Sequence, residues 1–168
     1  MIKPEYCMMM ARYNAWQNSG LCDMVATIPD AELRRDRGAF FGSIFATLNH
    51  ILWADHMWIS RFEKGDPPKL GGRDSVNATP DITIWSEERA AMDDRIAHWA
   101  ERVSAEVLEG DLSWYSGLKK SEVTMPMARC VAHFFNHQTH HRGQVHGMLT
   151  AAGLRPQDTD LFLMPDAG

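Results

Sequence analysis

The sequence has few cysteines, and their spacing does not suit a metal site. Cys7, Cys22 and Cys130 are the only three in 168 residues, and no two of them have C-x-x-C spacing. An odd number without this spacing argues against a disulfide framework and against a zinc site built from thiolates. It is typical of a reducing compartment, so we expect the protein to be cytoplasmic.

The sequence also lacks an excess of basic residues and a long apolar run. Its 17 lysines and arginines are outnumbered by 22 acidic residues, which gives a formal net charge of -5. A nucleic-acid surface needs a basic field, so we expect no nucleic-acid partner. The longest uncharged run, 38–54, is shorter than the ~20 apolar residues of a membrane span. Because Arg12 interrupts the first apolar stretch, we expect neither a signal peptide nor a membrane partner.

Several common catalytic motifs are missing as well. The chain has no H-E-x-x-H, no E-x-x-H pair, no P-loop and no G-x-G-x-x-G. These motifs mark zinc proteases, di-iron bundles, phosphoryl transfer and dinucleotide binding respectively. The sequence therefore weighs against each of these chemistries.

Apolar residues at three- and four-residue spacing predict four long helices. The expected helices cover about 4–28, 43–62, 80–107 and 126–152, with Pro29, Ser43, Pro80, Pro126 and Gly153 as boundary signals. A connection rich in glycine and proline, 64–80, separates the second helix from the third. Residues 112–125 predict a small hairpin around Gly117. This pattern predicts an all-α four-helix bundle in one domain over 1–168.

Five of the eight histidines lie within 133–146, and the helical period sorts them by direction. His137 and His141, one turn apart, share the apolar face of the fourth helix. His133 and His140 fall at its edge, and His146 lies on the far side. A divalent metal would bind the acceptor nitrogen of both inward imidazoles. The alternative is that they are histidines at the edge of the core, bonded to carbonyls or water.

A metal also needs a third ligand from another helix, because two histidines on one helix leave the opposite side open. The second helix offers His50, Asp55 and His56. Asp55 lies at the middle of the apolar stripe and His50 at a flank, so periodicity does not select His50. Asp55 could be a ligand, an acceptor that orients a ligand histidine, or the ion-pair partner of an arginine such as Arg12.

Three segments together resemble the DinB/YfiT-like superfamily. They are "ARYNAWQN" (11–18), "SIFATLNHILWADHMWISR" (43–61) and "FFNHQTHHRGQVH" (134–146). The resemblance covers nearly the whole chain, including the hairpin, and implies a four-helix bundle with up-down-down-up order. It also implies a divalent metal site of three histidines, which here are His50, His137 and His141. Zinc or nickel is the expected ion, and His56, His133 and His140 stay outside the ligand set.

The resemblance further implies a thiol-dependent transferase. A low-molecular-weight thiol, such as bacillithiol or mycothiol, would be activated at the metal for attack on a small-molecule electrophile. One alternative is a metal-dependent hydrolase, for which Asp55 and Glu122 are the candidate general bases. The other is a non-catalytic metal-binding, stress-related protein.

Other residues have two possible roles each. Arg142 could hold a substrate carboxylate, although a surface salt bridge is the commoner role of a helix arginine. Three tryptophans could line a pocket or belong to the core: Trp53, Trp58 and Trp114. A strip of small residues could serve packing within the bundle or contact between copies: Gly143, Gly147 and Ala151. We expect a homodimer.

Overall fold

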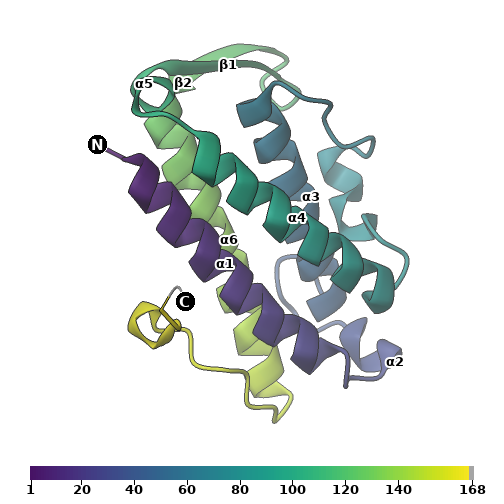
Figure 1. The fold of residues 1–168 in the computed structure, drawn as a ribbon. Helices are drawn as coiled ribbons and strands as arrows, with labels where there is room; N and C mark the ends of the chain where they lie inside the picture. Colours follow the sequence, from purple (N-terminus) through teal and green to yellow (C-terminus); the bar gives the residue numbers. More distant parts are fainter. Residues whose placement is uncertain (167–168) are drawn as a thin grey trace.

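Four long helices form most of the computed structural model, which describes residues 1–166 (Figure 1). They are α1 (Pro4–Val25), α3 (Ile44–Glu63), α4 (Ile82–Arg102) and α6 (Met127–Ala151). The shorter elements are α2 (Asp30–Leu33), η1 (Gly72–Asn77), α5 (Ala105–Glu109) and η2 (Leu161–Leu163). Strand β1 (Asp111–Ser116) pairs antiparallel with β2 (Ser121–Pro126). The predicted mainly helical bundle with a small hairpin is confirmed.

The helices pack in a pattern that does not follow the chain order. Helix α1 packs chiefly against α4, while α3 contacts both α4 and α6. The expected up-down-down-up order stays a prediction, as does the single domain over 1–168, whose last two residues lie outside the described part. Within residues 1–166 no helix combines the length and apolar character needed to cross a membrane.

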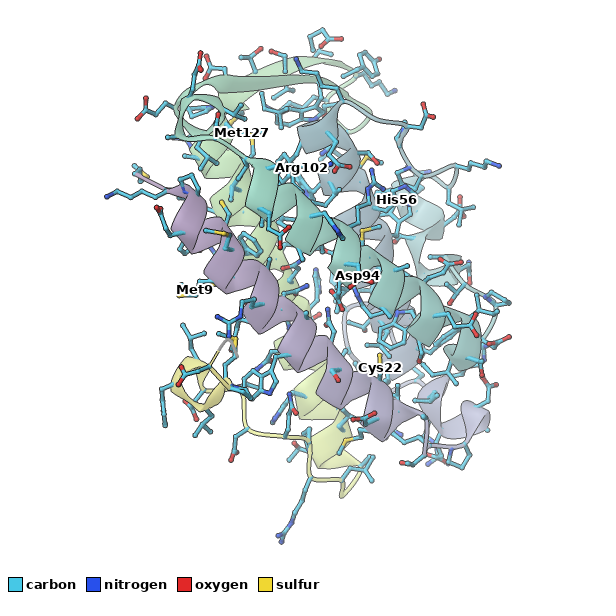
Figure 2. All side chains as sticks on the ribbon, viewed as in Figure 1. Met9, Cys22, His56, Asp94, Arg102 and Met127 are labelled. Carbon is cyan, nitrogen blue, oxygen red and sulfur yellow. The ribbon has the colours of Figure 1, made fainter. Side chains whose placement is uncertain are left out.

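The core lies between the four helices. Phe134 and Val145, both on the apolar stripe expected for the fourth helix, are fully buried. Trp85 is also buried and donates its indole N–H to the Leu48 carbonyl oxygen at 3.1 Å. Burying each such side chain contributes about 1.5–3 kcal/mol to the free energy of folding. The exposed Asp94 belongs to the outward face of α4, as Figure 2 shows.

The helix starts follow side-chain capping. Ser43 caps α3 as expected, and its Oγ accepts from the Ala46 N–H at 3.1 Å. Helix α4 begins at Ile82 rather than near Pro80, because the carboxylate of Asp81 accepts from the Ile84 N–H. A side chain that satisfies a free N–H of the first turn defines the start of a helix better than a proline does.

The expected third helix over 80–107 is divided in two. Helix α4 ends at Arg102 because Val103 adopts an extended conformation. Ser104 then caps the short α5 by accepting from the Val107 N–H. Val107 is consequently 46% exposed and is not part of the buried stripe. The prediction of one continuous helix over 80–107 was wrong, because the apolar spacing continues past Val103 although the helix ends there.

One buried asparagine holds the connection between α3 and α4 in place. Asn49 is fully buried, and its Oδ1 accepts from both the N–H and the hydroxyl of Thr79 at 3.0 and 2.7 Å. Its Nδ2 donates to the Val76 carbonyl oxygen at 3.1 Å. These bonds hold η1 against α3 one residue before His50.

Replacing Asn49 with alanine is expected to lower the free energy of unfolding by about 2–4 kcal/mol. The change leaves the buried N–H and hydroxyl of Thr79 without their acceptor, and each unpaired polar group costs about 1–3 kcal/mol. Urea denaturation measures the loss. Asn77→Ala, at an exposed position of the same connection, is the control. Equal stability of the two variants would contradict this account of the connection.

Candidate metal centre

The side chains of His50, His137 and His141 meet between α3 and α6. One ligand atom from each lies within 4.8 Å of the other two, and no other such cluster occurs in residues 1–166. The Nε2 atoms of His50 and His137 are 3.3 Å apart. Two nitrogens bound to one tetrahedral metal at 2.0–2.1 Å are about 3.3–3.4 Å apart. The spacing of these nitrogens therefore fits a shared divalent ion.

Hydrogen bonds to Nδ1 orient two of the three rings. His141 Nδ1 lies 2.7 Å from Gln144 Oε1, and His50 Nδ1 lies 2.9 Å from Ser75 Oγ. An amide oxygen only accepts, so His141 Nδ1 carries the proton and leaves the Nε2 lone pair free. Ligand histidines in metal sites are usually supported by such bonds. Sequence analysis missed both partners. Gln144 could have been found, because it lies three residues after His141 on the same helix. No local pattern marks Ser75, which lies in the connection between α3 and α4.

Burial keeps the imidazoles neutral. Desolvation, followed by the charge of His141, lowers the pKa of His50 from 6.5 to about 4. Desolvation and the neighbouring histidines lower the pKa of His137 to about 3. The pKa of His141 is also lowered, mainly by desolvation. Since a metal binds the neutral imidazole, the three rings are in the binding form at neutral pH.

The metal-free protein is expected to lose stability as the pH falls from about 6.5 to 4. In the unfolded chain these histidines regain a pKa near 6.5 and take up protons that the folded state does not. The unfolded state then binds more protons, so the free energy of unfolding decreases with falling pH. Urea midpoints at several pH values measure the slope. His137→Gln should flatten it; an unchanged slope in this variant would rule out His137 as a source.

Aromatic side chains surround the triad. The ring centre of Phe41 lies 4.0 Å from that of His50 and 5.4 Å from that of His141. Trp53 lies on another side, with its ring centre 6.1 Å from that of His50. Of the three tryptophans considered from the sequence, Trp53 is thus a neighbour of the triad. Phe41 was not foreseen, because it precedes the helix in an irregular segment where periodicity carries no information.

The other two tryptophans belong to a neighbouring cluster. The ring centres of Trp58 and Trp114 are 5.7 Å apart, and the guanidinium of Arg61 lies over both rings. The ring of His133 lies 5.0 Å from Trp58 and 5.6 Å from His137. His133 is therefore next to the triad without being part of it.

Asp55 is the centre of a buried ionic network. Its Oδ2 accepts from Arg89 Nη1 at 2.6 Å, and its Oδ1 accepts from Gln138 Nε2 at 2.9 Å. Arg89 also pairs with Asp93, 2.9 Å away. The side chains of Asp55 and Arg89 are each 1% exposed. The arginine partner of Asp55 is thus Arg89 and not Arg12, and this geometry leaves neither carboxylate oxygen for a metal or a proton-transfer role.

Arg142 also differs from its expected surface position. It is 5% exposed and donates from Nη1 to Asn14 Oδ1. Asn14 in turn donates to Asp93 at 3.0 Å, which links Arg142 to the network. Desolvation lowers the pKa of Arg142 to about 10, so it remains charged at neutral pH. Sequence reasoning missed this burial because charge alone predicts a surface position.

Comparison with known proteins agrees with this fold. Protein DinB from Bacillus subtilis (strain 168) is 25% identical over 168 residues, covering 95% of this chain and 93% of that protein. The solved structure of YfiT from Bacillus subtilis, described as "a probable metal-dependent hydrolase with an unusual four-helix bundle topology", matches with a TM-score of 0.65 and 16% identity over 92% of each chain. The DinB family model matches residues 1–167. This chain belongs to the DinB family.

Proposed function

We propose that this protein is a metal-dependent enzyme whose divalent ion, zinc or nickel, is held by the Nε2 atoms of His50, His137 and His141. The observation that carries the proposal is the 3.3 Å separation of Nε2 atoms from two different helices. When bound, such an ion lowers the pKa of a thiol or water beside it and supplies a nucleophile at neutral pH. Three protein ligands leave room for that group.

We further propose that the nucleophile is a low-molecular-weight thiol, transferred to a small electrophile. A positioned general base assists hydrolysis by metal-bound water, and the two carboxylates considered for it are poorly placed. Asp55 is fully paired, and Glu122 is exposed on the hairpin. A thiol has less need of a base, because its own pKa of about 8.5 is close to neutral pH. The ring of Phe41 would form one wall for the electrophile.

A metal-dependent hydrolase is the second candidate. YfiT, which is similar in fold, carries that description. His133 could act as the base, since its ring centre lies 5.6 Å from that of His137. Its pKa is lowered, first by desolvation and then by Arg61, so it is neutral and able to accept a proton. A non-catalytic metal-binding role is the remaining alternative.

A direct assay distinguishes these functions. Metal-loaded protein is mixed with a chromogenic electrophile with and without a small thiol, and in parallel with chromogenic esters. For a thiol-dependent transferase, we expect the electrophile to be consumed only when both the thiol and the metal are present. Turnover of esters without thiol, abolished by His133→Ala, would favour the hydrolase instead. Inactivity of the loaded protein towards both classes would favour the non-catalytic role.

Ser75→Ala is expected to weaken metal binding about tenfold. The hydroxyl bonds His50 Nδ1 and holds the ring with Nε2 toward His137, and removing such a partner typically costs 10–100-fold in affinity. Competition with a chelator measures the change. Ser60→Ala is the matched control, because Ser60 is buried in α3 but bonds Arg95. Equal affinities for the two variants would show that Ser75 does not support the site.

We also propose a homodimer of single-domain chains in the cytoplasm, with the four long helices in up-down-down-up order. The extensive packing of α1 against α4 supports this order. An added Cβ at Gly147 would meet no described atom within 4 Å beyond its chain neighbours and its own helix backbone, which leaves that part of α6 open to a second copy. The cysteines, all free in the described chain, suit a reducing compartment.

A further inference from the structure

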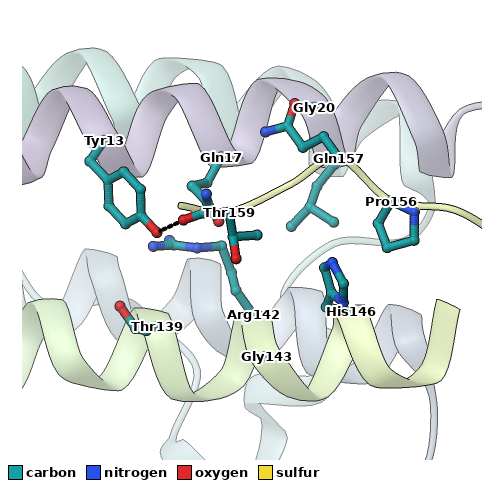
Figure 3. Close-up of a pocket in the computed structure, with 11 residues that line it drawn as sticks. Tyr13, Gln17, Gly20, Thr139, Arg142, Gly143, His146, Pro156, Gln157 and Thr159 are labelled. Atoms are coloured by element: carbon teal, nitrogen blue, oxygen red, sulfur yellow. Dashed lines mark hydrogen bonds between the residues drawn. The ribbon is translucent and has the colours of Figure 1, made fainter. Parts of the chain in front are cut away.

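A cavity lies between α1, α6 and the segment 154–165 that follows α6. It has a volume of about 130 Å³, and the histidine triad does not line it. Figure 3 shows Gln17 of α1 and Arg142 of α6 on opposite sides of this cavity, with Pro156, Gln157 and Thr159 crossing over it. The cavity shares helix α6 with the proposed metal centre, but none of the three histidines lines it.

Two buried donors of this cavity have no partner in the described chain. Gln17 and Arg142 are each 5% exposed, and neither Gln17 Nε2 nor Arg142 Nε bonds any atom of residues 1–166. Buried N–H groups in native proteins are almost always paired with protein, water or ligand. Two unpaired donors that line the same small cavity point to an acceptor between them.

The charge around the cavity favours an anion. Within the described chain its lining contains Arg142 and His146 but no aspartate or glutamate. The nearest carboxylates along the buried network, Asp55 and Asp93, pair directly with Arg89. Arg142 bonds that network through the neutral amide of Asn14, whose oxygen accepts from Nη1, and not through a carboxylate. The other edge of the guanidinium, formed by Nε and Nη2, is the edge that binds a carboxylate with two parallel bonds.

The segment after α6 is fastened over this cavity. The hydroxyl of Tyr13 donates to the Thr159 carbonyl oxygen, and Gln157 Nε2 donates to the Trp16 carbonyl oxygen at 3.3 Å. The side chain of Gln157 fills the space beside Gly20, where an added Cβ would lie 2.1 Å from its Oε1. Glycine at position 20 therefore provides the room in which this cover lies.

We propose that this cavity binds a small monocarboxylate, held by the Nε edge of Arg142 and by the side-chain amide of Gln17. Its volume equals about four water molecules at roughly 30 Å³ each, which suits a carboxylate of one to three carbons. Leu21 and Pro156 line the same cavity and offer apolar surface to the short carbon chain. The site is independent of the metal centre proposed above.

Titration of the full-length protein with sodium acetate tests this site. The probe is the ¹⁵N resonance of Arg142 Nε, followed with acetamide as the uncharged analogue and chloride as a simple anion. We expect acetate to shift this resonance in a saturable way, acetamide to leave it unchanged, and chloride to shift it much less. Gln17→Leu should weaken acetate binding about tenfold, since a hydrogen bond to a charged group is lost. Gln17 lies outside the ionic network, so this variant should keep the fold.

Two results would overturn the proposal. If acetate leaves the Arg142 Nε resonance unmoved while the protein stays folded, the two donors are satisfied by water or, for Arg142, by the amide oxygen of Gln17. If chloride binds as tightly as acetate, or if Gln17→Leu binds acetate as well as the parent protein, the cavity does not recognise a carboxylate in the proposed way. Neither result depends on whether the histidine triad binds a metal.

Discussion

Protein purified without an affinity tag is expected to carry close to one divalent ion per chain, and His137→Ala to lose most of it. His137 contributes Nε2 only 3.3 Å from His50 Nε2 and is one turn of α6 from His141. Without it, two imidazoles from different helices remain, which is fewer than divalent metal sites normally use. We expect the affinity to fall at least about a hundredfold, more than removal of a supporting hydrogen bond would cause.

Elemental analysis of both proteins measures this difference. His133→Ala is the matched control, since its ring is 5.6 Å from His137 but lies outside the cluster. Comparable metal in the parent protein and in His137→Ala would remove the proposed centre. Loss of metal only in His133→Ala would mean that His133, and not His137, is the ligand from this part of α6.

Metal release is also expected at a lower pH than for ordinary histidines. Competition by protons begins where the free imidazoles titrate, and the pKa values of His50 and His137 are about 4 and 3. Between pH 7.5 and 5.5 the affinity should therefore fall by no more than about tenfold, through His141, whereas three imidazoles with a pKa near 6.5 would lose about a thousandfold. Metal binding titrations across this range decide between the two behaviours.

Arg89→Met is expected to lower the free energy of unfolding by about 3–5 kcal/mol. Arg89 is 1% exposed and is the only cation within salt-bridge distance of Asp55 in the described chain. Its removal leaves that buried carboxylate, and that of Asp93, without their direct ion pairs. Removing one partner of a buried ion pair costs this much because an uncompensated charge remains. The loss is large, since the whole free energy of unfolding of a domain is only about 5–15 kcal/mol.

Arg95→Met provides the matched comparison in the same helix. Arg95 pairs with Glu63 at 2.9 Å, but its side chain is 32% exposed. A pair that stays hydrated contributes about 0–1 kcal/mol, so we expect a small change in its urea midpoint. Similar losses in both variants would mean that burial does not control the strength of these ion pairs.

Short-range features of the sequence were enough to predict where most helices and the hairpin lie. Apolar spacing located the four long helices, and residues 112–125 around Gly117 located the hairpin. Ser43 was foreseen as a cap because capping depends on a side chain and an N–H within one turn. The break at Val103 was not foreseen, since an extended residue between two apolar stretches leaves the spacing intact.

The sequence by itself determined that His137 and His141 share the inner face of one helix, because 3.6 residues per turn is a property of every α-helix. The third member, His50, came from resemblance to a family and not from periodicity. Only the tertiary structure placed its Nε2 beside His137, brought Ser75 to its other nitrogen, and buried Asp55 against Arg89. Those contacts join residues 25 to 87 positions apart, and such distances are set by how helices pack together, which no repeat along the chain encodes.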